Sequence, residues 1–192
     1  MMKQMTIIAL LAVFLLTGVC SAAISRTDEP FFGWVVLQSE WNLDHNDKGE
    51  TVVTKNGPIK IALIKKMAKP VGKKDNAEYG VFVEWVSDKY SSFVPWSYIR
   101  LEQETVNLSH HTAIADLTDP QKQPVDKEGK RFYFPQTQVA LWPHMVDTIK
   151  TKNNIGFRFY LSVEEKPAPS LTISIPGEVL AEWRHIIKAQ YE

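Results

Sequence analysis

The chain has 192 residues, of which 44% are hydrophobic, and its 22 basic residues balance its 22 acidic residues. A balanced charge gives no general attraction to nucleic acid, so we expect no nucleic-acid partner. The single cysteine excludes an intrachain disulfide, but a chain of this length buries enough surface to fold without one. We therefore expect one disulfide-free core.

The first predicted element is a cleaved secretory signal peptide over residues 1–22. Lys3 precedes an apolar run at 5–19 and small residues follow that run, which is the usual order of the regions in such signals. The run is shorter than the ~20 residues that a membrane-spanning helix needs. We expect cleavage after Ala22 or Ala23, and an uncleaved anchor is the alternative.

Cys20 offers a third interpretation of this end, in which the cysteine is acylated in a lipoprotein. Such proteins carry a small residue just before the cysteine and usually Leu three residues before it, whereas Val19 and Thr17 hold those places here. Export without lipidation is therefore favoured. Residues 23–192 are expected to form a single exported domain, either periplasmic or secreted.

The first part of the exported region is predicted to be rich in β-strands. Ile59, Ile61 and Leu63 alternate with other residues, which is typical of a strand with one buried face. Pro95 cannot donate a hydrogen bond to a strand ladder, so it predicts an edge or a bulge. The expected strands cover 33–41, 58–64, 79–86, 93–102 and 130–134.

The stretch WNLDHNDKGE at 41–50 resembles a calcium loop, because acidic and amide residues alternate in it. Counted from Asp44, however, Lys48 and Lys55 stand where an EF-hand loop needs oxygen ligands. The stretch is therefore predicted to be a hairpin turn, which Asn, Asp and Gly favour. The same turn chemistry recurs at 126–129.

The last third predicts helices around a β-hairpin. Apolar residues from Val139 to Ile149 have helical spacing, so a helix is expected from near Leu141, with Pro143 in its first turn and Gly156 at its end. Alternation then predicts strands at 156–163 and 171–175. An apolar stripe predicts a terminal helix and consists of Val179, Leu180, Trp183, Ile186 and Ile187. The expected fold class is α+β: a mainly antiparallel sheet or β-sandwich with one or two packed helices in the C-terminal third.

This order of helix, strand, strand and helix, with Gly177 and Ala181 opening the last helix, resembles that of the exported invasion-associated locus B proteins. The resemblance covers about the last third of the chain. Glu178 stands where that family usually has an aromatic residue, and no function is carried over from the resemblance.

Aromatic residues are concentrated around the predicted strand at 93–102. Trp96, Tyr98 and Arg100 alternate onto one of its faces. If the residues between them face the core, rings and a cation are left outside, which suits the binding of a protein or a sugar. With Trp85, these three are the candidate binding residues. The alternative is that the rings fill the core, because aromatic side chains dominate core burial.

Lysines are concentrated after the predicted strand at 58–64, in a segment whose Pro and Gly predict a loop. Such a basic patch suits an anionic lipid, a lipopolysaccharide or an acidic protein surface. The alternative is a solvated hairpin loop whose lysines keep a sheet edge soluble. The patch consists of Lys65, Lys66, Lys69, Lys73 and Lys74.

Motifs of familiar catalytic sites are absent from the sequence. It contains no Walker loop, no G-x-S-x-G and no H-E-x-x-H, so we name no catalytic residue, metal or cofactor. His110 and His111 would point to opposite faces of a strand and so would not share a metal, but Asp116 or Asp119 could complete a metal site with one of them. A pair of histidines in a surface loop is the alternative.

Together these patterns favour an exported, non-catalytic binding protein of the bacterial cell envelope. Its expected partner is another envelope or secreted protein, bound by the aromatic strand face. The first alternative is a module that binds a glycan or an anionic lipid surface through the same rings or the lysines. The second is a hydrolase with an unrecognised carboxylate or histidine site.

Overall fold

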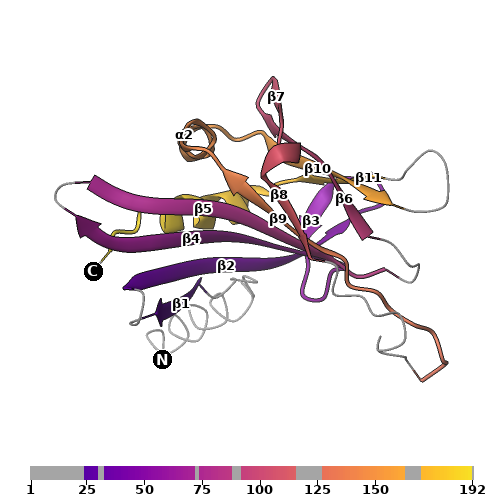
Figure 1. Cartoon of the computed structure of the whole chain (residues 1–192). Coiled ribbons are helices and arrows are strands. Elements are labelled where there is room, and N and C mark those ends of the chain that lie inside the picture. Colours follow the sequence, from indigo (N-terminus) through magenta and orange to yellow (C-terminus); the bar gives the residue numbers. More distant parts are fainter. Residues whose placement is uncertain are drawn as a thin grey trace, which may run out of the picture.

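A computed structural model of the protein describes residues 24–29, 33–71, 74–87, 92–115, 127–162 and 170–191 (Figure 1). At 69–71, 74–76, 111, 113–115 and 162 it describes the backbone alone. The predicted signal peptide and Cys20 lie outside the described residues. Within the described ranges, no helix combines the length and the hydrophobicity that crossing a membrane requires.

Two antiparallel sheets make up most of the described chain. The larger sheet has seven strands in the order β1-β2-β4-β5-β9-β8, with β3 paired to β2, and the smaller has the order β11-β10-β6-β7. The larger sheet consists of β1 (Ile24–Glu29), β2 (Trp34–His45), β3 (Thr51–Val53), β4 (Ile59–Val71), β5 (Lys74–Trp85), β8 (Thr112–Ala115) and β9 (Gln136–Leu141). The smaller sheet consists of β6 (Ser92–Leu101), β7 (Glu104–Asn107), β10 (Ile155–Ser162) and β11 (Ser170–Ser174). With helices α2 (Pro143–Thr151) and α3 (Gly177–Lys188), this architecture confirms the expected α+β class.

The long strands form because apolar residues alternate along them, so that one face of each strand is buried. On β4 the side chains of Ile59, Ile61 and Leu63 are fully buried, as predicted. The hairpin of β10 and β11 is confirmed as well. The strand expected at 130–134 is wrong, since Tyr133 forms only an isolated bridge to Ser87. Pro135 follows it and has no N–H for a ladder.

Helix α2 begins later than the sequence predicted. Val139 and Leu141 belong to β9, and Pro143 is the first helical residue. A residue that precedes proline avoids the helical conformation, and Trp142 accordingly has an extended backbone with ψ of 158°. The expected end at Gly156 is also wrong, because the helix ends at Thr151.

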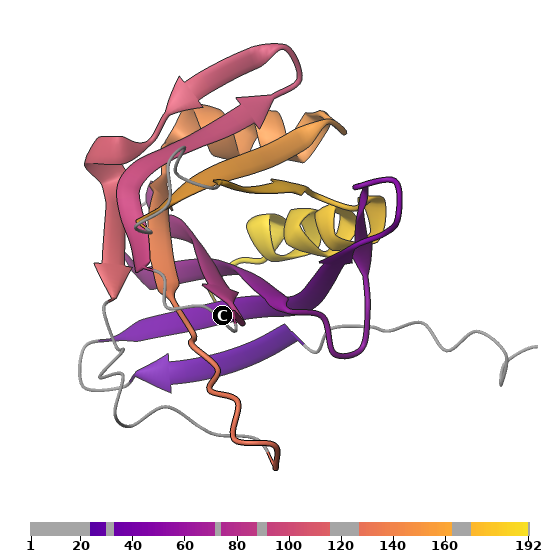
Figure 2. The same ribbon diagram turned by 90° about the vertical axis from the view of Figure 1, so that its right-hand side faces the viewer.

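Helix α3 lies between the two sheets and contacts both of them (Figure 2). Its buried stripe is the predicted one. The ring of Trp183 packs edge-on against Phe157 of β10, with 6.4 Å between the ring centroids. Toward the larger sheet, a carboxylate oxygen of Glu182 accepts hydrogen bonds from Ser39 and Trp41 of β2. This helix therefore joins the sheets through a shared core.

The stretch at 46–50 is the predicted hairpin turn, and it connects β2 to β3. The side-chain oxygen of Asn46 accepts hydrogen bonds from the backbone N–H groups of Lys48 and Glu50, each at 3.0 Å. Gly49 has a φ of 75°, a conformation that glycine adopts without strain. The oxygen atoms that suggested calcium ligands thus stabilise the turn itself.

Gly57 lies where the backbone approaches β2 so closely that no side chain fits. An added β-carbon would lie 2.1 Å from the carbonyl oxygen of Leu43, so Gly57→Ala forces backbone atoms apart. We expect this change to lower the free energy of unfolding by about 2 kcal/mol, measured by urea denaturation. Gly177→Ala is the control, because an added β-carbon there has no neighbour within 4 Å. Equal stability of the two variants would contradict the prediction.

Candidate binding site

The outer face of β6 carries the aromatic and cationic residues that the sequence singled out. Trp96 is 63% exposed and Arg100 is exposed, while Tyr98 is half-buried. Ile99 and Leu101 alternate with them and point into the core. The alternative that these rings fill the core is therefore wrong for Trp96.

Strand β6 is irregular next to this face. The pairing of β6 with β10 shifts register between Phe159 and Leu161, opposite the segment that contains Pro95. The shift confirms the bulge or edge expected at this proline, which has no N–H to donate. Trp96 lies within the irregular segment, between the paired residues Phe93 and Ser97, so regular pairing of this face begins at Ser97.

Strand β10 brings two further residues to the same face. Arg158 pairs with Tyr98 across the ladder, and Gly156 pairs with Arg100. The rings of Tyr98 and Tyr160 meet edge to face, with 6.1 Å between their centroids. The outer face of the smaller sheet, as we call it, therefore consists of Trp96, Tyr98, Arg100, Arg158 and Tyr160.

A hollow of about 370 Å³ opens on this surface around Gly156. Because this residue has no side chain, the space beside Arg100 stays open, and an added β-carbon would lie 3.8 Å from a guanidinium nitrogen of that arginine. Hydroxyl groups of Thr105, Thr172 and Ser174 also line the hollow.

The hollow is cationic. Arg100 donates a hydrogen bond to the side-chain oxygen of Asn154 at 3.1 Å, and Arg158 donates one to the hydroxyl of Thr172 at 3.2 Å. Both acceptors are neutral, and neither arginine forms an ion pair with a described residue. The hollow therefore combines two guanidinium groups, tyrosine rings and hydroxyl groups, which can together hold an anion.

Trp85 does not belong to this surface. It ends β5 in the larger sheet and is partly buried against the hydrophobic core. The structure therefore does not bring this candidate binding residue together with Trp96, which belongs to the other sheet.

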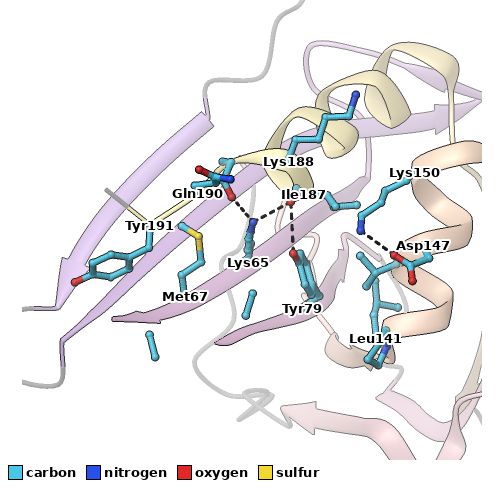
Figure 3. Close-up of a pocket in the computed structure, with 15 residues that line it drawn as sticks. Lys65, Met67, Tyr79, Leu141, Asp147, Lys150, Ile187, Lys188, Gln190 and Tyr191 are labelled. Carbon is cyan, nitrogen blue, oxygen red and sulfur yellow. Dashed lines mark hydrogen bonds and ion pairs between the residues drawn. The ribbon is translucent and has the colours of Figure 1, made fainter. Parts of the chain in front are cut away.

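The predicted basic patch requires correction. Where the sequence predicted a loop, Lys65, Lys66 and Lys69 lie on strand β4 and Lys74 begins strand β5. Lys65 is only 4% exposed, and its ammonium group donates hydrogen bonds to the carbonyl oxygens of Ile187 and Ala189 at the end of α3. Figure 3 shows this arrangement, with the hydroxyl of Tyr79 near the same helix end. Lys65 thus stabilises the helix terminus rather than contributing to a surface patch.

Lys66 points to the opposite face of β4. Its ammonium group lies 3.1 Å from the ring centroid of Trp34 and 3.7 Å from a carboxylate oxygen of Glu78. The side chains of Lys69 and Lys74 are not described, and Lys73 lies outside the described residues.

A second hollow, of about 390 Å³, adjoins the end of α3 (Figure 3). Met67, Tyr79 and Tyr191 line it, and Asp147 and Lys150 form an ion pair of 2.8 Å on its α2 side. Asp147 and Lys150 pair with each other, and Lys65 donates its hydrogen bonds to the end of α3. The charged groups of this hollow are therefore less suited to holding a ligand than the two arginines of the first hollow.

Most residues of the metal site that the sequence suggested at His110 and His111 have no described side chain. His110 is exposed, but the side chain of His111 is not described, and Asp116 and Asp119 lie outside the described residues. A ring nitrogen of His45 is hydrogen-bonded to the carbonyl oxygen of Thr172 at 2.8 Å, which links β2 to the edge strand β11.

Sequence reasoning missed Arg158 and Tyr160. The sequence contained a signal for them, because Phe157, Phe159 and Leu161 alternate along the predicted strand at 156–163, and the residues between such an apolar set face the other way. That alternation carried no information on the pairing of β10 with β6, and only this pairing joins the two arginines in one hollow.

Comparisons of the chain with family models, with curated proteins and with solved structures gave no significant match.

Proposed function

We propose that the protein is an exported, non-catalytic binding protein of the bacterial cell envelope, and that it recognises another protein with the outer face of its smaller sheet. The observation that carries this proposal is the exposure of Trp96, at 63%, in one surface with two arginines and two tyrosines. Trp, Tyr and Arg are the residues most enriched among the energetic hot spots of protein interfaces.

The proposed export rests on the amino-terminal pattern. Lys3, the apolar run at 5–19 and the small residues after it have the layout of a signal peptide. The mature domain would then act in the periplasm or outside the cell.

A glycan-binding module is the second candidate. The exposed ring of Trp96 favours it, because flat aromatic rings offer a face on which sugars can stack. The alternative in which the lysines bind an anionic lipid surface has less support, since the buried ammonium group of Lys65 donates a hydrogen bond to the carbonyl oxygen of Ile187.

The proposal is tested by replacing Trp96 and Tyr98 together with alanine. The tagged mature protein is crosslinked briefly in its native cells, purified, and its bound proteins are identified by mass spectrometry. We expect a reproducible protein partner for the original chain and its loss from the double variant, because both rings leave the outer face.

The control variant is Trp142→Ala, which removes another exposed tryptophan, 40% exposed, next to α2. This variant should retain the partner. Equal recovery of the partner by the double variant and the original chain would overturn the proposal, provided that circular dichroism shows both to be folded.

A further inference from the structure

We propose that the hollow around Gly156 is a subsite for a carboxylate group, and that the outer face therefore recognises an extended polypeptide segment with an acidic side chain. This inference rests on the proposed function, because it assigns a partner chemistry to the same surface. It goes further by naming the group that the two arginines bind.

The first argument is the arrangement of charge. Arg100 pairs with Gly156, and Arg158 pairs with Tyr98, so the two arginines are diagonal neighbours across the ladder. The Cα atoms of diagonal residues in an antiparallel pair are ~7–8 Å apart, which is close enough for like-charged side chains on one face to repel each other. The hydrogen bonds that each guanidinium group makes to described residues have neutral acceptors. A carboxylate between them removes this repulsion and accepts charge-assisted hydrogen bonds from both.

The second argument is the space between the charges. Gly156 lies in register between Arg100 on one side and Ser174 on the other. An added β-carbon at this glycine would lie 3.1 Å from the carbonyl oxygen of Ile173, so a side chain there would crowd the backbone of β11. The hollow of about 370 Å³ beside the glycine has room for a carboxylate, and Ser174, which also lines it, carries a hydroxyl group that can donate a further hydrogen bond.

The third argument concerns what carries the carboxylate. Residues two apart on a strand are separated by ~6.6 Å, and so are residues two apart in an extended peptide. A peptide that runs along β6 can therefore place an apolar side chain near Tyr98 and Tyr160 while an acidic one enters the hollow beside Arg100. Trp96, the ring best suited to a sugar, does not line the hollow. The spacing thus favours a peptide over an acidic glycan.

Selection of a displayed library of short random peptides on the mature protein tests this inference. We expect the enriched peptides to carry Asp or Glu two residues from an aromatic or aliphatic residue. Arg100→Gln and Arg158→Gln should each weaken their binding by about tenfold or more, because each removes charge-assisted hydrogen bonds. Arg26→Gln is the matched control, since Arg26 is an exposed arginine on β1 of the larger sheet, and it should leave the affinity unchanged.

The outcomes separate this inference from the proposed function. Peptides whose binding depends on Trp96 and Tyr98 but survives both arginine changes would overturn the carboxylate subsite alone. Peptides that depend on none of the four residues would overturn both. Enrichment of no peptide, or binding of alginate or heparin in its place that is lost with Arg100→Gln, would overturn the assignment to an acidic peptide.

Discussion

Replacing Trp183 with alanine is expected to lower the free energy of unfolding by about 3–5 kcal/mol. The indole ring is fully buried, and it packs against Phe157 at the place where α3 meets the smaller sheet. Alanine removes this contact and leaves a cavity that two sheets and a helix cannot close by a local movement. Urea denaturation followed by circular dichroism measures the loss.

Trp96→Ala is the matched control, because it is the same substitution at a side chain that is 63% exposed. We expect it to change the free energy of unfolding by less than about 1 kcal/mol. The nitrogen of the Trp183 ring has no hydrogen-bond partner among the described residues, so Trp183→Phe should cost less than the alanine change. Equal effects of alanine at 96 and at 183 would contradict the packing described for α3.

The contrast between these two tryptophans shows how much the sequence could predict. The apolar stripe of the terminal helix predicted that Trp183 lies in the core, because the side-chain period of a helix depends on local backbone geometry. Alternation along β6 separated Trp96 from Ile99 and Leu101 but did not decide which face of the strand is buried. The beginning of α2 was predicted wrongly because helical spacing outweighed the restriction that Pro143 places on Trp142.

The candidate site was predictable only in part. Tyr98 and Arg100 were identified on their strand, but the hollow also needs Gly156 and Arg158 from β10. Strand pairing between distant segments depends on the packing of the whole sheet, and neither strand's own sequence encodes it uniquely. Trp85 was grouped with this site because it is near in sequence, whereas its strand belongs to the other sheet.

The prediction that Lys65 belongs to a basic surface patch was wrong for a different reason. Ile61, Leu63, Lys65 and Met67 fall on one face of β4, and all four are buried. The alternation of this strand continues through the lysines, so its period already indicated that Lys65 and Lys66 point in opposite directions. The Pro and Gly of the segment led to the prediction of a loop, and the alternation of buried and exposed positions along the strand was not taken into account.

The buried position of Lys65 leads to the second large effect. Lys65→Met is expected to lower the free energy of unfolding by about 3 kcal/mol. It keeps most of the side-chain volume but removes two charge-assisted hydrogen bonds to the carbonyl oxygens of Ile187 and Ala189. Those oxygens end α3, where the negative end of the helix dipole favours a cation. Circular dichroism during urea denaturation gives the value, and hydrogen exchange should show earlier opening of the last turn of α3.

Lys66→Met is the matched control, since it makes the same change one residue away on the opposite face of β4, where Lys66 is only partly buried. Lys66 contacts the Trp34 ring and Glu78, and such partly exposed contacts contribute about 1 kcal/mol or less. If the lysines instead acted together as a surface patch, the two variants would have similar stability, and both would weaken retention on anionic vesicles. A larger loss of stability with Lys65→Met than with Lys66→Met is therefore the result that assigns the first lysine to the fold.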